Sequence, residues 1–180
     1  MGVRGIARDL ATAGFGTLKK IKTPNLITKA KKIFGSSTLC AIVETIKIDS
    51  DYFISCSNGR DLVKYNPVTW ACYLEDLGVG EIFLTSVNKE GLKSGFDINI
   101  IEKISSKLNI PVIAHGGAGN FEHIKKLIKN TNIDGVAISS LLHYSTAPYF
   151  IKNFNNTGNT HFLETLKKET KKINVIKNLK

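Results

Sequence analysis

The fold is decided by the stretch Gly78-Val-Gly-Glu-Ile-Phe-Leu-Thr-Ser-Val-Asn-Lys-Glu-Gly-Leu-Lys-Ser-Gly-Phe-Asp97. A largely apolar run of strand length, Glu81 to Leu84, leads into Thr85-Ser86 and then into a loop that contains Gly91 and Gly95. In parallel α/β proteins, ligands bind at the carboxyl ends of strands, because the loops and helix N-termini there supply unpaired N–H donors. The stretch therefore predicts a strand that brings hydroxyl groups and glycines to the ligand-binding end of a sheet.

The same arrangement recurs twice further along the chain. The strand-like segment Ile110–Ala114 is followed at once by His115-Gly-Gly-Ala-Gly-Asn120, and Gly135–Ile138 is followed by Ser139-Ser140. Each strand alternates with a helical pattern, so the sheet should be parallel and buried on both faces. The chain has four clear strand patterns and a weaker fifth, whereas a closed TIM barrel needs eight. We therefore predict an incomplete (β/α) barrel, about half to five-eighths of the full fold.

Helix signals support this alternation. We expect three helices whose ends are marked by capping residues: Thr23–Gly35, Asn66–Gly78 and Asp97–Leu108. Asp97 is expected to be an N-cap. In the helix that follows the Gly-Gly-Ala-Gly loop, Ile124, Leu127 and Ile128 are expected to face inward.

The segment before the central stretch is expected to form a strand with an inserted hairpin. Thr38–Glu44 is an apolar strand pattern that ends in a carboxylate, which would place Glu44 at the rim of the sheet. Ile46–Cys56 is strand-like and is followed by an Asn58-Gly59 turn, which predicts a small hairpin or lid. As domains, we expect residues 1–22 to be a poorly defined remnant of a preceding βα unit and residues 23–180 to form the half-barrel.

Composition narrows the class of protein. The chain has 180 residues, 42% of them hydrophobic, and a formal charge of +10 that comes almost wholly from lysines in helix-like segments. We expect a cytoplasmic protein that binds neither nucleic acid nor membrane, because no recognised nucleic-acid module and no apolar run of about 20 residues is present. Three cysteines without a CxxC pair and histidines without ligand spacing predict free thiols, no metal site and no cofactor. The positive field suits a phosphorylated small molecule.

A phosphate-binding site is predicted at the last two strand ends. Gly116 and Gly117 lie between a strand and a helix, so their N–H groups can approach an anion without a Cβ in the way. Ser139 and Ser140 occupy the equivalent place one strand later, and loops after the last two strands commonly bind phosphate in such barrels. The alternative is that both pairs are only tight turns.

Two carboxylates and one histidine are the candidates for acid–base work. Glu44 ends a strand on the presumed active face, and Glu90 lies in the loop after Thr85-Ser86. His115 lies at a strand end beside the glycines, where it could hydrogen-bond a ligand. The alternatives are an exposed loop charge for Glu90 and a polar supporting role for His115.

These residues carry a family resemblance. The segments Gly78–Asp97, Ile110–Asn120 and Asp134–Tyr144, together with Pro24–Gly35 and the strand that ends at Glu44, resemble the cyclase subunit of imidazole glycerol phosphate synthase, a histidine-biosynthesis (β/α)₈ barrel. The resemblance implies a glutamine amidotransferase partner that supplies ammonia. It also implies a ribonucleotide-type substrate with a phosphate at each end, which is split and cyclised into imidazole glycerol phosphate and aminoimidazole carboxamide ribotide.

The resemblance also assigns roles to single positions. Glu44 stands where the family has its second catalytic aspartate, and His115 replaces a small hydroxyl residue. The regions that hold one substrate phosphate and line the mouth contain Thr85, Gly91, Gly117, Ser139 and Ser140. The family's Asp-Arg-Asp-Gly loop is here Asn88-Lys-Glu-Gly91, and the first catalytic aspartate belongs to a first half that this sequence lacks.

Two further hypotheses stay open. Relatives of this barrel serve in surface-polysaccharide synthesis as accessory subunits that pass ammonia to a sugar-amidating enzyme, and Asn88 and Glu44 are consistent with such a scaffold of little chemistry. A generic phosphate-binding half-barrel is the third interpretation. Because a shortened barrel leaves open strand edges and an exposed apolar lumen, we expect a homo-oligomer, a completing partner or an incomplete gene product.

Overall fold

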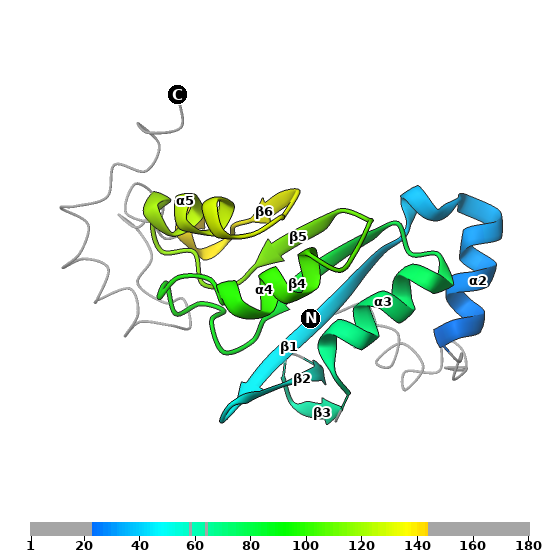
Figure 1. Cartoon of the computed structure of the whole chain (residues 1–180), viewed down its shortest axis with the longest axis horizontal. Coiled ribbons are helices and arrows are strands. Elements are labelled where there is room, and N and C mark those ends of the chain that lie inside the picture. Colours follow the sequence, from blue (N-terminus) through cyan, green and yellow to red (C-terminus); the bar gives the residue numbers. More distant parts are fainter. Residues whose placement is uncertain (1–22, 58, 64, 144–180) are drawn as a thin grey trace, which may run out of the picture.

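The computed structural model of the chain describes residues 23–57, 59–63 and 65–143. Its sheet has the strand order β3-β2-β1-β4-β5-β6 (Figure 1). The strands are β1 (Cys40–Ile48), β2 (Asp51–Cys56), β3 (Asp61–Val63), β4 (Glu81–Ser86), β5 (Val112–His115) and β6 (Gly135–Ala137). The helices are α2 (Thr23–Phe34), the 3-10 turn η1 (Ser36–Thr38), α3 (Pro67–Leu77), α4 (Ile98–Ser105) and α5 (Phe121–Asn130). A further helix begins at Ser140.

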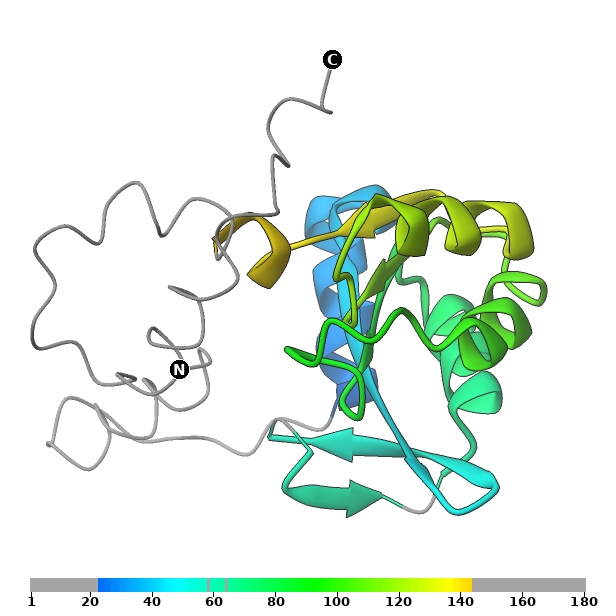
Figure 2. The same ribbon diagram turned by 90° about the vertical axis from the view of Figure 1, so that its left-hand side faces the viewer.

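Strands β1, β4, β5 and β6 form a parallel sheet in which each strand pairs with the next. Helices α3, α4 and α5 connect these strands and pack on the same face of the sheet, as Figures 1 and 2 show. The predicted fold class, a partial (β/α) barrel of the TIM type, is confirmed. Within the described part of the chain, no helix has the length and hydropathy that a membrane span requires.

The core lies between the sheet and these helices. Val43, Leu84 and Ala114 are register partners on this face, and each is at most 1% exposed. The opposite face, which we call the inner face, carries Ile42 and its register partner Phe83. Ile42 is 69% exposed, so the prediction that the sheet is buried on both faces is wrong. An apolar strand pattern does not reveal whether a second layer covers both faces of a strand.

Strand β1 is longer than predicted because the inserted hairpin extends it. Its residues Glu44–Ile48 pair antiparallel with β2, which in turn pairs with β3. The hairpin itself is confirmed, and Figure 1 shows it at the carboxyl end of β1. Glu44 is therefore not the end of its strand. It still lies level with the rim of the parallel sheet, because its register partner is Thr85 near the end of β4.

The helix ends show how well local sequence signals predict capping interactions. The Asn66 side chain accepts hydrogen bonds from the N–H groups of Val68 and Thr69, and Gly78 ends α3 with φ 99°, as expected. Asp97 is the N-cap residue of α4, as predicted, but its side chain makes no capping hydrogen bond to the helix. Its carboxylate instead accepts a hydrogen bond of 2.8 Å from the Tyr52 hydroxyl of β2.

Two smaller expectations about the helices are also wrong. Helix α4 ends at Ser105 rather than at Leu108. In α5, Leu127 is fully buried, but Ile128 is 60% exposed and does not face the core. Apolar residues at adjacent positions lie about 100° apart on a helix, so only one of this pair points directly at the sheet.

Candidate functional site: a pocket at the carboxyl end of β5 and β6

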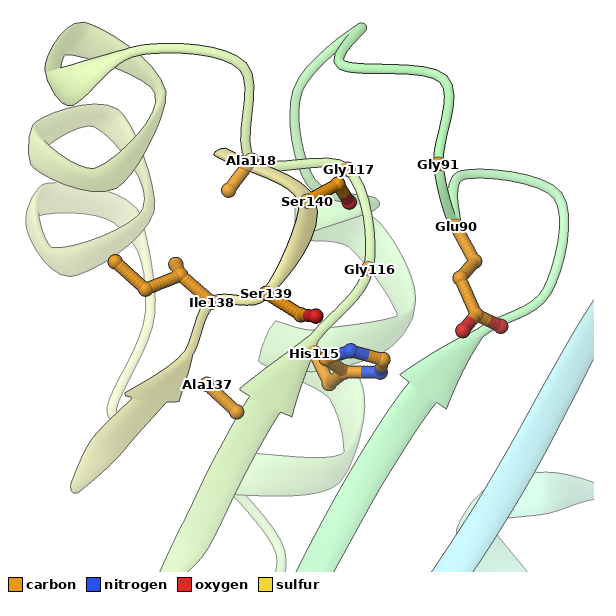
Figure 3. Close-up of a pocket in the computed structure, with 10 residues that line it drawn as sticks. All are labelled: Glu90, Gly91, His115, Gly116, Gly117, Ala118, Ala137, Ile138, Ser139 and Ser140. Carbon is orange, nitrogen blue, oxygen red and sulfur yellow. The ribbon is translucent and has the colours of Figure 1, made fainter. Parts of the chain in front are cut away.

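A pocket lies where three connecting segments meet at the carboxyl ends of the strands (Figure 3). The segments are the β4–α4 loop, the end of β5 with the loop after it, and the end of β6 with the start of the next helix. Its lining residues are Glu90, Gly91, His115, Gly116, Gly117, Ala118, Ala137, Ile138, Ser139 and Ser140. The cavity volume of about 170 Å³ is below the roughly 300–1,000 Å³ of sites that hold whole drug-sized ligands. It therefore suits one group of a ligand, such as a phosphate.

The glycine loop after β5 needs its glycines for packing. Gly116 and Gly117 have φ angles of 96° and 106°, which side chains rarely adopt. A Cβ on Gly117 would lie against the Gly95 carbonyl oxygen, well inside van der Waals contact. The Gly95 N–H donates a 2.8 Å hydrogen bond to the Gly117 carbonyl, so this loop and the β4–α4 loop hold each other in place. The tight-turn interpretation accounts for both glycines, because the space that a Cβ would need is taken by the end of β4 and the β4–α4 loop.

The segment after β6 brings the start of a helix to the same pocket. The helix begins at Ser140, and its first turn is closed by a 2.9 Å hydrogen bond from the His143 N–H to the Ser139 carbonyl. The first N–H groups of a helix have no partner within the helix, and the helix dipole makes this end partly positive. Figure 3 shows the hydroxyls of Ser139 and Ser140 directed toward the Gly116–Gly117 segment. Hydroxyl and N–H donors therefore converge on one cavity.

His115 is the last residue of β5 and is held by two contacts on the inner face. Its Nδ1 atom lies 3.2 Å from the Thr85 hydroxyl oxygen, and its ring centroid lies 5.2 Å from that of Phe83. Thr85 is only 6% exposed and is outside the pocket lining, so its side chain acts on the pocket by positioning His115. The imidazole therefore has a fixed place at the pocket wall.

Glu90 lies at the pocket, and Glu44 does not. Glu90 is an exposed residue of the β4–α4 loop that lines the pocket beside Gly91. The Glu44 carboxylate accepts a 3.3 Å hydrogen bond from the Gly59 N–H, in the loop between β2 and β3. Beside it, at its register position on β2, Ser55 is 3% exposed, and its hydroxyl has no hydrogen-bond partner among the described residues. Glu44 thus fastens the hairpin to the rim.

Asn88 fastens the hairpin in a second way. Its side-chain oxygen accepts a 2.6 Å hydrogen bond from the Lys47 N–H, and its side-chain nitrogen donates a 3.1 Å bond to the Lys47 carbonyl. The amide therefore pairs with β1 as another strand would. An amide can donate and accept here, whereas an ionised carboxylate at this position could only accept.

The hairpin has a third polar contact, through Tyr52. Its hydroxyl donates to Asp97 at the start of α4, and the ammonium groups of Lys47 and Lys103 lie 5.4 and 5.9 Å from the Tyr52 ring centroid. Burial, followed by the hydrogen bond to the Asp97 carboxylate, raises the pKa of Tyr52 to about 12. We call this region the hairpin end of the rim. It consists of β1 beyond Thr45, β2 and β3, together with Glu44, Asn88 and Asp97, which contact them.

The structure thus sorts the predicted site residues into two groups. It brings Glu90, Gly91, His115, Gly116, Gly117, Ser139 and Ser140 together at the pocket and leaves Glu44 and Thr85 outside its lining. Ala118, Ala137 and Ile138 also line the pocket, although no motif in the sequence marked them as site residues. These apolar residues follow or end predicted strands, so their nearness to the rim was the one signal that could have indicated them.

Comparison with known proteins agrees with this architecture. A family model described as histidine biosynthesis protein matches residues 6–148. The chain belongs to the histidine biosynthesis protein family. This confirms the resemblance drawn from the strand-end motifs, and the family fold is consistent with the half-barrel described above.

Curated relatives of the chain include proteins named imidazole glycerol phosphate synthase subunit HisF. The protein of Prosthecochloris aestuarii is 39% identical over 124 residues, which cover 69% of this chain and 49% of the relative. The proteins of Chlorobaculum tepidum and Staphylococcus epidermidis are 35% and 36% identical, over 70% and 68% of this chain and 50% of each relative. The chain therefore spans about half the length of the curated relatives it matches.

Proposed function

We propose that the pocket binds a phosphate group of a phosphorylated ribonucleotide-type substrate. The observation that carries this proposal is the convergence of the Gly116-Gly117 backbone and the helix start at Ser139-Ser140 on one small cavity. Backbone N–H groups without a Cβ, hydroxyl groups and the positive end of a helix dipole all favour an anion. The cavity volume fits a phosphate better than a whole substrate.

Phosphate binding can be tested with a charge placed at the pocket. Ser140→Asp puts a carboxylate at a helix N-terminus, where the dipole favours it, so the helix should stay folded. A like charge about 4 Å from the anion costs several kcal/mol even near a surface, so the Kd for inorganic phosphate should rise by at least about tenfold. Ser50→Asp, at an exposed turn residue between β1 and β2, is the matched control and should change the Kd little. Equal phosphate binding by both variants would refute the pocket as the site.

The reaction that we propose is the cyclase step of imidazole glycerol phosphate synthase. A glutamine amidotransferase partner would supply ammonia, and the products would be imidazole glycerol phosphate and aminoimidazole carboxamide ribotide. Glu90 at the pocket is the carboxylate positioned to exchange a proton with a bound ligand, and Glu44 would need to leave Gly59 to do so. Family membership and the pocket support this proposal. The test is ammonia-dependent turnover of the phosphorylated substrate by the purified chain and by its Glu44→Asp variant.

A second candidate function is favoured by the hairpin end. Glu44 and Asn88 stand where the resemblance places carboxylates of the family, yet both are engaged in contacts that hold the hairpin. An accessory subunit of a sugar-amidating system in surface-polysaccharide synthesis would need a rigid scaffold of this kind but few catalytic groups of its own. Absence of turnover and of substrate binding in both the wild type and Glu44→Asp would support the accessory role. Turnover in either would exclude it.

We further propose that a second copy of the chain completes the barrel. In the described part of the chain, the outer edge of β6 and the Cys40–Val43 edge of β1 have no strand partner. Both are edges of parallel strands, so β6 of one copy can pair with β1 of another about a twofold axis and give eight strands. The exposed Ile42 would then lie inside the barrel.

The oligomeric state tests this assembly. Ile42→Lys should convert a dimer into a monomer in sedimentation or light-scattering measurements, because it would bury an unpaired charge in the lumen. Ile128→Lys is the matched control, since Ile128 is an equally apolar, 60% exposed residue on α5, outside the proposed interface. A monomeric wild type, or the same response from both variants, would overturn the proposed dimer.

A further inference from the structure

The pocket lining is poor in positive charge. Glu90 and His115 are its two titratable residues, and the other described lining residues are glycines, alanines, serines and one isoleucine. A bound anion would therefore meet N–H and hydroxyl donors, one carboxylate and one imidazole. His115 is the lining side chain that can carry a positive charge, and it can do so only when protonated.

The contact with Thr85 suits both protonation states of His115. The Thr85 hydroxyl lies 3.2 Å from Nδ1 and can either donate or accept a hydrogen bond. With a neutral ring, the hydroxyl donates to Nδ1 and the ring proton is on Nε2. With a protonated ring, Nδ1 donates to the hydroxyl. In both states Nε2–H is the donor left for a ligand, and the ring stays in place against Phe83.

We propose that His115 makes the anion affinity of the pocket depend on pH, by binding phosphate-type dianions in its cationic form. This inference rests on the proposed phosphate-binding function and adds the residue that regulates it. A histidine side chain ordinarily gains its proton as the pH falls from about 8 to 5. Hydrogen bonds from a charged donor are about twice as strong as those from a neutral one. Affinity should therefore rise as the pH falls through this range.

Other charged groups near His115 could also affect anion binding, and their effects must be distinguished from that of the imidazole. Glu90 faces the pocket from the β4–α4 loop, and Glu44 lies two strands away at the same register level on β1. From β6 the register neighbour is the neutral Ala137. The Lys89 Cβ lies close to Gly117 on the loop side. Protonation of Glu90 would also raise anion affinity at low pH, so Glu90 is the competing source of any pH dependence.

Sulfate is the suitable probe, because it keeps its double charge over this pH range, whereas a phosphate monoester changes its own charge near pH 6. We would measure sulfate Kd values by calorimetry between pH 8 and pH 5.5. The wild type should bind at least about fivefold more tightly at the lower pH. His115→Asn should lose the pH dependence of sulfate binding. Glu90→Gln should bind sulfate more tightly than the wild type at pH 8 and should keep the pH dependence. His123→Asn, a nearby histidine whose Nδ1 accepts a hydrogen bond from the Gly119 N–H, should also keep it.

The outcomes separate this inference from the function on which it rests. If the wild type binds neither sulfate nor phosphate at any pH, the phosphate pocket itself fails. If it binds sulfate with a flat pH profile, or if Glu90→Gln removes the dependence and His115→Asn does not, only the role of His115 fails. Should His115→Asn not fold, NMR titration of the wild-type histidine ring protons decides the matter. Sulfate must then move the protonation midpoint of His115 to higher pH, and an unchanged midpoint overturns the proposal.

Discussion

The two ends of the carboxyl rim use their polar groups differently. At the pocket end, the glycine loop after β5 and the serines after β6 face a cavity. At the hairpin end, Glu44, Asn88 and Tyr52 make hydrogen bonds to Gly59, Lys47 and Asp97. The same rim thus carries one region open to a ligand and one region where Glu44, Asn88 and Tyr52 are engaged in structural contacts. Polar residues at strand ends are therefore not sufficient evidence for chemistry.

This difference shows why a scaffold contact and a binding role have to be distinguished residue by residue. Glu44 occupies a position that the family resemblance marks as catalytic, but the contact it makes is to a backbone N–H of the hairpin. Ser139 and Ser140, which the sequence assigns either to phosphate binding or to a tight turn, do line the pocket. Substitutions at the two ends are expected to differ in effect, and the largest effect belongs to the pocket end.

The largest effect is expected from Gly117→Ala at the pocket end. The new methyl group would collide with the Gly95 carbonyl, and φ 106° is unfavourable for alanine. Together the clash and the backbone strain should lower the free energy of unfolding by about 3 kcal/mol. Urea denaturation measures this change, and phosphate calorimetry on the folded fraction should show weaker binding.

Gly35→Ala separates strain from collision. Gly35 follows α2 with φ 81°, and a Cβ there would meet open space. Its φ of 81° and ψ of 159° lie in a region nearly confined to glycine, so the substitution should cost about 1–2 kcal/mol from backbone strain alone, less than strain and collision together at Gly117. Equal losses for Gly35→Ala and Gly117→Ala would show that the two loops do not press on each other as the structure indicates.

A smaller effect is expected from Asn88→Asp at the hairpin end. The carboxylate keeps an acceptor for the Lys47 N–H but loses the donor to the Lys47 carbonyl, and it faces that carbonyl with a negative charge. The loss should be about 1–2 kcal/mol of stability. Phosphate affinity should stay unchanged, because Asn88 is outside the pocket lining. Asn132→Asp, at an exposed loop residue before β6, is the control and should be nearly neutral.

The contrast between the two ends also explains which features the sequence could predict. Caps such as Asn66 and Gly78 are local signals, and the pocket followed from the rule that parallel strands end at a common edge. The Tyr52–Asp97 and Asn88–Lys47 contacts join residues 45 and 41 positions apart, and no local pattern encodes such pairs. Ile42 was misplaced for a related reason, because an apolar residue in a strand says nothing about whether a second layer covers it.

The smallest effect is expected from Tyr52→Phe, which tests whether the hairpin end is tied to α4 as well as to β4. The variant keeps the ring between Lys47 and Lys103 but loses the hydroxyl that donates to Asp97, so it should cost about 1 kcal/mol or less. The pKa of Tyr52 is raised to about 12 in the folded protein, against about 10 for an ordinary tyrosine.

The sign of the pH dependence follows from that raised value. The neutral phenol is the favoured form in the folded state, so its stabilising contribution is complete below pH 10 and is lost as the pH rises through 12. Wild-type stability should therefore fall more steeply than that of Tyr52→Phe between these pH values. The ultraviolet titration of phenolate should differ between the two proteins by one tyrosine that ionises late. Tyr65→Phe, at a residue 55% exposed, is the matched control. If the tyrosine missing from Tyr52→Phe ionises near pH 10, then Tyr52 does not hold the hairpin to α4 in solution.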